Sequence, residues 1–256
     1  KPYTVEGLKQ SNRYRAAATQ ISEFGFTAVI PMRMQNRTMG IICLGKNLRC
    51  SDYSQTDLDF LFALSSLATI AIENAHLLQE AIEKQQMEDE LHIAREIQKG
   101  LFPAALPSIH SVELAAVNIQ SQDVGGDYYD AVPINDDKFV FAIGDVAGKG
   151  MPASLLMANV QAALRTLAPI CSSMSEMMNR INNVVCSNIH SAGKFITFFA
   201  GFYHPGTKQF TYSNAGHNPP FVIHQDGSIT RLHEGGLILG VFPNTNYDER
   251  TLQVMS

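Results

Sequence analysis

Two apolar stretches around a short polar turn form the first clear pattern in the chain. The segment from Gly25 to Gly45 reads FTAVIPMRM, then QNRT, then MGIICLG. Two apolar runs joined by a polar turn are typical of paired strands. We therefore predict a β-hairpin between these two glycines.

A long helix is predicted next. Ser54 precedes Asp57 by three residues at the head of an apolar run, a common pattern at helix starts, so we expect the helix to begin near Gln55. Apolar residues then recur with heptad spacing, which predicts a one-sided seam that needs a partner helix. The seam consists of Leu61, Leu64, Ala68, Ala71, Ala75, Leu78 and Ile82.

The apolar pattern changes phase at Gln85 and Gln86. It resumes at Met87, Leu91, Ala94, Gln98 and Leu101, and it ends at Gly100 and Pro103. We interpret residues 55–101 as a linker helix between domains, and we expect a homodimer through it in the form of a coiled coil. Two separate helices joined near Gln85 are an open alternative.

Strands, turns and two helices follow Leu106. The segment Phe139 to Asp145 reads as a strand, and Pro152 suits the first turn of a helix that runs to about Ala168. A second helix is capped by Ser173 and Glu176, and its apolar stripe is Met177, Ile181, Val184 and Val185. Three strands are then predicted by FITFFAGFY, KQFTYSN and PPFVIHQ. This order is typical of an α+β domain with sequential antiparallel strands flanked by helices.

Composition narrows the classes of function. With 256 residues, of which 45% are hydrophobic, the chain can form one large domain or two ordinary ones. A net charge of -5 without a run of Lys or Arg argues against nucleic acid as a partner. The four cysteines lack CxxC spacing, so we interpret them as buried thiols in a reducing cytoplasm rather than zinc ligands. No apolar run approaches membrane-spanning length, so we expect no membrane contact within this chain.

Two aspartates carry the candidate chemistry. The stretch VGGDYYDAVPINDDKFVFAIGDVAGKG reads as strand, polar turn, strand and glycine-rich loop, and Asp127 and Asp145 lie nine positions to either side of Asp136. If the turn centres there, the two carboxylates face each other across the hairpin, about 5 Å apart at Cβ. A divalent cation would neutralise them, and all-oxygen ligands favour magnesium or manganese over zinc.

The glycines around the acid pair suit such a site. Gly125 and Gly126 let the backbone approach closely, and Gly148 and Gly150 permit a sharp turn that could aim the Val146 carbonyl at a metal. Two solvated aspartates at strand ends remain an open alternative.

Other motif readings are weaker. GDVAGKG has only three residues between Gly144 and Gly148 and lacks the final Ser or Thr of a phosphate-binding loop. GGDYYD lacks the Glu-Phe pair of the GGDEF cyclase signature. His217 could be a metal ligand, a general acid or a turn histidine, and we favour the turn role. Ser154 and Ser213 have no nucleophile context.

With these motifs in hand, the chain resembles the PPM metal-dependent protein phosphatases, in the branch typified by SpoIIE and RsbU. The resemblance covers residues 91–256 and lies in AREIQKGLFP, VGGDYYD, IGDVAGKGMPASLLM, FITFFAGFY, NAGHNPP and GGLILGVF, which occur in the order and spacing of the family. Residues 24–78 resemble, more weakly, the C-terminal half of a GAF sensor domain.

The resemblance implies an α-β-β-α sandwich of two antiparallel sheets flanked by helices, with two manganese or magnesium ions between the sheets. Asp127 and Asp145 would be catalytic metal ligands, together with the Val146 carbonyl. The ions would lower the pKa of a water molecule and orient the phosphoryl group. The implied substrate is a phosphorylated serine or threonine of an anti-sigma-factor antagonist.

This reading divides the chain into three parts. Residues 1–54 would be the C-terminal part of a GAF-like domain, residues 55–101 the linker helix, and residues 102–256 a phosphatase domain. The further aspartates of the family lie in a TDG segment and near the C-terminus, so we expect the phosphatase domain to be truncated at Ser256. A catalytically silent sensor or scaffold that binds a partner without turnover is the alternative function.

Overall fold

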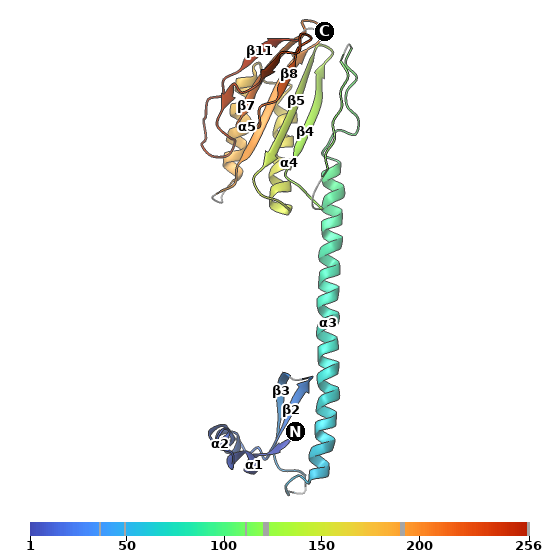
Figure 1. Cartoon of the computed structure of the whole chain (residues 1–256), viewed down its shortest axis with the longest axis vertical. Coiled ribbons are helices and arrows are strands. Elements are labelled where there is room, and N and C mark those ends of the chain that lie inside the picture. The colour runs from blue at the N-terminus through green and yellow to red at the C-terminus, as the bar shows by residue number, and fades with distance from the viewer. Residues whose placement is uncertain (36, 49, 111, 120–122, 190–192, 255–256) are drawn as a thin grey trace. The chain divides into compact units, whose positions relative to one another are not determined.

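The computed structural model describes residues 1–35, 37–48, 50–110, 112–119, 123–189 and 193–254. The chain divides into two compact units, Lys1–Met87 and Glu88–Ser256, and Figure 1 shows the elements of each. The boundary falls inside the long helix. The division into residues 1–54, 55–101 and 102–256 therefore stays a prediction.

The first unit contains a three-stranded antiparallel sheet. Its strands are β1 (Tyr3–Thr4), β2 (Ala28–Met34) and β3 (Arg37–Leu44), in that order across the sheet. The predicted hairpin is confirmed, because β2 and β3 pair from Ala28 with Leu44 to Met34 with Arg37. Two short helices, α1 (Val5–Lys9) and α2 (Arg15–Glu23), precede the hairpin, and Val5, Ala18 and Val29 form a small core with it.

The long helix α3 spans Gln55–Lys99 without a break. Its predicted start is confirmed: the amide and hydroxyl of Ser54 donate to the Asp57 carboxylate at 2.9 and 2.6 Å, and the Asp57 amide donates to the Ser54 hydroxyl at 3.2 Å. Because the helix continues through Gln85 and Gln86, the alternative of two separate helices is wrong.

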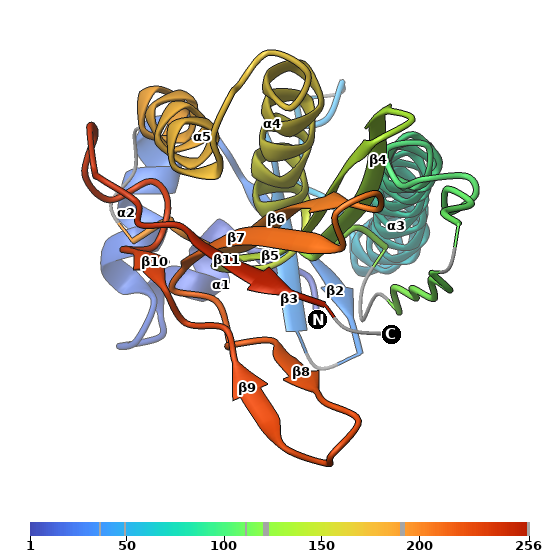
Figure 2. The ribbon, with the colours of Figure 1, turned by 90° about the horizontal axis from the view of Figure 1, so that it is seen from above.

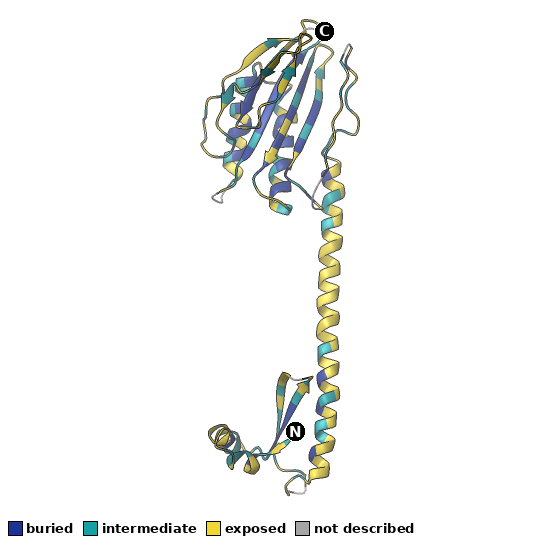
Figure 3. Cartoon of the chain, viewed as in Figure 1, coloured by how far each residue is buried: buried dark blue, intermediate teal, exposed yellow. Residues whose placement is uncertain are grey.

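The two halves of the apolar seam on α3 have different surroundings. Leu61 packs with Leu58 against the β2–β3 hairpin, where the Ser65 hydroxyl also donates to the Pro31 carbonyl at 3.3 Å. The rest of the first half is exposed to solvent, as Figure 3 shows, and comprises Leu64, Ala68, Ala71, Ala75, Leu78 and Ile82. In the second half, Gln98 is buried and Leu91 and Ala94 are partly buried. Exposed positions therefore dominate the seam from Leu64 to Met87, and packed positions begin at Leu91.

One property of α3 differs from the sequence expectation. By length and composition alone, α3 is long and apolar enough to cross a membrane. The expectation that no apolar run reaches this length is therefore wrong. The same composition also occurs in helices that bury an apolar stripe against protein, as α3 does on β2 and β3.

The second unit is built on a six-stranded sheet. Along the sheet the order is β10 (Gly235–Gly236), β7 (Gln209–Ala215), β6 (Ile196–His204), β5 (Lys138–Val146) and β4 (Tyr128–Asn135), and β11 (Arg250–Gln253) also pairs with β7. A separate hairpin consists of β8 (Phe221–Ile223) and β9 (Ile229–Arg231). The sequential antiparallel pairing of β4 to β7 confirms the predicted α+β class.

Two helices cover one face of this sheet, and the β8–β9 hairpin lies on the other side (Figure 2). Helix α4 (Met151–Leu167) carries Pro152 in its first turn, and α5 (Met174–Asn188) is capped by Ser173, whose hydroxyl accepts from the Glu176 amide at 3.1 Å. Met157, Met177 and Phe198 are fully buried between helices and sheet. This layer is the main hydrophobic core, and it fixes the sheet that carries the acid pair.

Two details of the predicted packing are wrong. Met177, Ile181 and Val185 are buried, but Val184 is 37% exposed and does not belong to the stripe of α5. Of the four cysteines, only Cys171 is buried, and Cys50 is exposed. All four are free thiols.

Candidate functional site

The register of β4 and β5 brings the two predicted aspartates together. The strands pair Tyr128 with Gly144 and continue in step to Pro133 with Phe139. Asp127 directly precedes the first of these pairs and Asp145 directly follows its partner, so they stand opposite each other at the open end of the hairpin. The predicted cross-strand pair is confirmed as a geometric relationship.

The turn itself differs from the prediction. The register shifts between Pro133 and Asn135, and Asn135 pairs with Lys138, which leaves Asp136 and Asp137 as the turn residues. The Asn135 side chain accepts from the Asp137 amide at 3.0 Å and stabilises this turn. A local irregularity therefore absorbs one residue, and the acid pair stays in step although the turn does not centre on Asp136.

The electrostatics of the two carboxyl groups are coupled. Partial loss of hydration raises the pKa of Asp145, and the negative charge of Asp127 and a side-chain hydrogen bond with Asp127 raise it further. Both residues are exposed to solvent. The pair thus consists of two acidic side chains set opposite each other at an accessible surface, an arrangement that favours binding of a cation.

Close backbone approach shapes the same end of the hairpin. A Cβ atom on Gly126 would lie 2.9 Å from the Val146 Cβ, 3.0 Å from the Val146 carbonyl oxygen and 3.2 Å from the Ala153 Cβ. Only glycine fits there. The Val146 carbonyl therefore lies against the segment that leads directly into Asp127.

The glycine-rich loop after β5 turns as predicted. Gly148 and Gly150 have φ values of 110° and 72°, which are strained for residues with side chains. A Cβ atom on Gly148 would also lie 2.7 Å from the Lys194 Nζ. Gly150 is the N-cap of α4, so the turn passes directly from the acid pair to that helix.

His217 belongs to the site and is more than a turn residue. Its backbone amide donates to the Asn214 side chain at 2.7 Å, as expected of a turn. Its ring, however, contacts the Thr197 hydroxyl through Nδ1 at 2.9 Å and lines a pocket with Asp127 and Asp145. Burial lowers the pKa of His217, and the two carboxylates partly oppose this shift.

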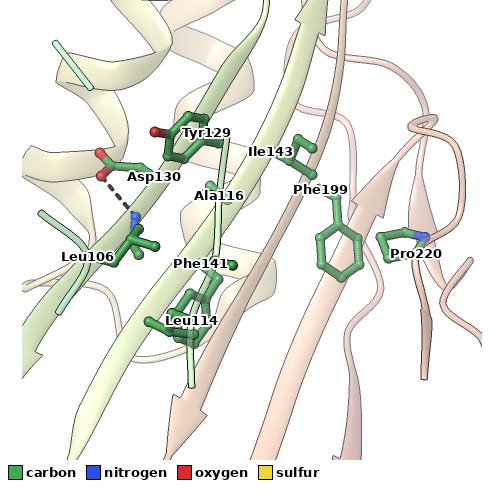
Figure 4. Close-up of a pocket in the computed structure, with 12 residues that line it drawn as sticks. Leu106, Leu114, Ala116, Tyr129, Asp130, Phe141, Ile143, Phe199 and Pro220 are labelled. Carbon is green, nitrogen blue, oxygen red and sulfur yellow. Dashed lines mark hydrogen bonds between the residues drawn. The ribbon is translucent and has the colours of Figure 1, made fainter. Parts of the chain in front are cut away.

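Two adjoining pockets lie beside the hairpin. The acidic pocket has a volume of about 370 Å³, and its lining includes Asp127, Asp145, His217 and Asn118. It shares Tyr129 and Ile143 with an apolar pocket of about 260 Å³. The lining of the apolar pocket also includes Leu114, Phe141, Phe199 and Pro220, as Figure 4 shows. The acid pair therefore borders an open polar hollow next to an apolar one.

The donor atoms fit a hydrated divalent ion. Among the described residues, no three His, Cys, Asp or Glu side chains gather closely enough to hold a metal by themselves. Magnesium, however, usually binds through one or two carboxylates and keeps several water ligands. Asp127 and Asp145, with the Val146 carbonyl at the same end of the hairpin, match that requirement.

Sequence reasoning missed two polar residues near the site. Gln98 was assigned to the apolar seam, but it is 4% exposed and bonds the backbone of Gly125, two positions before Asp127. Asp130 is fully buried and is held by Arg165 of α4 and by the Tyr128 hydroxyl. The sequence does contain one indication that Gln98 is special, because it is a polar residue at a position where the helical pattern predicts an apolar one.

The sequence of the second unit is similar to those of known bacterial proteins. Residues 135–256 match the family of the stage II sporulation protein E, SpoIIE. The phosphoserine phosphatase RsbU of Bacillus subtilis is 32% identical over 167 residues, which cover 65% of this chain and 49% of RsbU. Protein IcfG of Synechocystis sp. is 27% identical over 191 residues, which cover 64% of this chain and 30% of IcfG. The chain thus spans half or less of the length of these two relatives.

The fold agrees with this similarity. The solved SiaA-PP2C domain of Pseudomonas aeruginosa superposes with a TM-score of 0.53 at 16% identity, over 68% of this chain and 70% of that domain. This likeness supports the α+β phosphatase fold. Residues 135–256 thus match the SpoIIE family in sequence, and the likeness to the SiaA-PP2C domain agrees with that match in fold.

Proposed function

We propose that the chain is a metal-dependent protein phosphatase that releases phosphate from a phosphoserine or phosphothreonine of a partner protein. The observation that carries the proposal is that the strand register sets Asp127 and Asp145 opposite each other at the open end of the β4–β5 hairpin. Two adjacent carboxylates without a cation between them repel, and a divalent ion turns that repulsion into binding. The match to the SpoIIE family and the similarity to RsbU support the same activity.

The proposed cofactors are two manganese or magnesium ions, held by the carboxylates of Asp127 and Asp145 and by the carbonyl of Val146. When bound, such ions supply a water molecule of lowered pKa and offset the negative charge of the phosphoryl group. The chain contributes the position of the carboxylates, which the hairpin register fixes. It also contributes the open acidic pocket, which admits a phosphorylated side chain.

His217 has a proposed supporting role in this pocket. Its Nδ1 atom contacts the Thr197 hydroxyl, an arrangement that fixes the ring and lets Nε2 face a ligand. Burial favours the neutral ring. A neutral imidazole can donate one hydrogen bond to a phosphoryl oxygen.

The proposal also includes a substrate class, a role for the first unit and an oligomeric state. The substrate is a small phosphorylated protein of the anti-sigma-factor antagonist type, and the first unit acts as a GAF-like sensor. The exposed stripe of α3 supports a homodimer through this helix, since an apolar heptad seam needs a partner in water.

The activity is tested by phosphate release. The full chain is incubated with a phosphoserine protein and manganese, and then compared with Asp145→Asn and with the control Asp136→Asn, which alters an exposed turn residue of the same hairpin. We expect release by the wild type and the control, and almost none by Asp145→Asn. Equal phosphate release by the wild type and Asp145→Asn would contradict the proposed metal-dependent mechanism.

The alternative is a silent scaffold that binds its partner without turnover. It is favoured because, among the residues that the structure describes, no third His, Cys, Asp or Glu side chain lies close enough to share a metal ion with the pair. The same assay separates the two functions. A scaffold would retain the phosphoprotein without releasing phosphate, whatever metal is supplied.

A further inference from the structure

The side chain of Gln98 forms a two-point contact with one residue of the loop that enters the acid pair. Its Nε2 atom donates to the Gly125 carbonyl at 2.7 Å, and its Oε1 atom accepts from the Gly125 amide at 3.0 Å. Since Gly125 offers one donor and one acceptor, only one orientation of the Gln98 amide satisfies both. The side chain is 4% exposed, so water competes little for these bonds.

The other side of the same loop is closed by packing. Gly126 lies so near Val146 that a Cβ atom would overlap the Val146 Cβ, and it would also press closely on Ala153. The strand pairing begins only at Tyr128, and Asp127 itself is exposed. Two constraints therefore set the position of the Asp127 carboxylate. The contact of Gln98 with Gly125 holds the chain before Asp127, and the β4–β5 pairing holds the chain after it.

A second contact ties the same helix face to the same segment. Arg95, one turn before Gln98 on α3, forms an ion pair with Asp123 at 3.6 Å. After the helix, Phe102 packs against Tyr129 with a centroid separation of 5.3 Å. The end of α3 and the residues just after it thus contact the chain on both sides of Asp127, and within the helix Gln98 makes a contact nearer to Asp127 in sequence than Arg95 does.

We infer that Gln98 is a positioning residue, through which the end of helix α3 sets the place of Asp127 opposite Asp145. The inference rests on the proposed function. A displacement of α3 along or about its axis changes the two hydrogen bonds to Gly125. Because Asp127 follows Gly125 by two residues, its carboxylate then moves relative to Asp145. Without Gln98, the loop loses its only bidentate side-chain contact among the described residues, and the carboxylate samples positions farther from Asp145.

The test compares Gln98→Leu with the control Gln161→Leu. Gln161 is also a buried glutamine, and its Nε2 donates to the Leu101 carbonyl at 3.2 Å, so its loss weakens the same helix end without touching Gly125. Manganese binding to the full chain is measured by electron paramagnetic resonance. We expect Gln98→Leu to weaken it about 10- to 100-fold, in the range of other residues that orient metal ligands, and the control to leave it within about 2-fold of the wild type.

A second readout does not need the metal. Amide hydrogen exchange at Gly125 should be faster in Gln98→Leu than in Gln161→Leu, measured in chelator. If Gln98→Leu does not fold, Gln98→Glu takes its place, because it keeps the acceptor and loses the donor. Equal manganese affinity and equal exchange in the Gln98 and Gln161 variants would overturn the inference.

The two proposals can fail separately. If the wild type binds no manganese, the proposed function is overturned. Hydrogen exchange of the Gly125 amide then tests the positioning role of Gln98 by itself. Faster exchange in the Gln98 variant supports it, and equal exchange rejects it.

Discussion

The guanidinium of Arg165 holds the carboxylate of Asp130 through two hydrogen bonds, of 2.8 Å from Nε and 3.1 Å from Nη2. The Asp130 side chain is fully buried, and it also accepts from the Tyr128 hydroxyl at 2.7 Å and from the Ala131 amide at 2.9 Å. This ion pair joins α4 to β4, three residues after Asp127. It therefore connects the helical layer to the strand that carries the acid pair.

Loss of Arg165 should destabilise the second unit strongly. Arg165→Met leaves a buried carboxylate without its cation, and we expect the free energy of unfolding in urea to fall by about 3 kcal/mol. The double variant Asp130→Asn with Arg165→Met should recover part of this loss, because it leaves no buried charge. A double variant less stable than Arg165→Met would contradict this account of the pair.

Gly126→Ala should disturb the site through steric overlap with β5. The added methyl group would meet the Val146 Cβ and carbonyl at 2.9 and 3.0 Å, so the loop must move away from β5. We expect manganese affinity and thermal stability both to fall. The matched control is Gly206→Ala, in a turn where a Cβ atom meets nothing within 4 Å. Similar losses in both variants would mean that crowding at Val146 does not matter.

Stability should depend on pH through His217. Burial lowers its pKa in the folded chain, so the neutral ring contributes stability above the ordinary value of about 6.5 and loses it as the pH falls through the lowered value. Urea unfolding of metal-free protein should therefore show that the wild type loses more stability than His217→Gln between about pH 7.5 and pH 5.5. The groups that face the ring are Asp127, Asp145 and Thr197. A constant difference between the two proteins over this range would reject the assignment.

The exposed stripe on α3 should govern self-association. Leu78 is 62% exposed and Ile82 is 44% exposed, and both lie on the predicted seam. Leu78→Lys with Ile82→Lys should shift the chain from dimer to monomer in analytical ultracentrifugation, because two charges in each helix would enter the seam. Leu77→Lys is the control, since Leu77 is 54% exposed but lies off the seam. A wild-type monomer would refute the dimer outright.

The parts of the fold that were predicted correctly depend on local, periodic signals. The β2–β3 hairpin, the start of α3 and the cross-strand relationship of Asp127 and Asp145 each follow from alternation, capping or spacing within one continuous segment of the chain. The pairing of Asp127 with Asp145 was predicted correctly, although the predicted centre of the turn was wrong. Strand pairing is strongly specified where one face of a sheet is buried.

The missed features depend on contacts between distant segments. Arg165 and Asp130 are 35 positions apart, and Gln98 and Gly125 are 27 apart, so no local pattern joins them. The sequence around His217 indicated a turn, and its backbone does form one. Its ring, however, contacts Thr197 of β6, which no local pattern indicates. Helices α1 and α2 were also not predicted, since they are short and rest on a small core.

The central claim is that the two carboxylates at the end of the hairpin hold divalent metal. It is tested most directly by diffraction at the manganese absorption edge from crystals of the full chain grown with manganese. The account predicts an anomalous peak within coordination distance of carboxylate oxygens of both Asp127 and Asp145. A well-ordered site with no peak there, or with manganese bound only elsewhere, would contradict it.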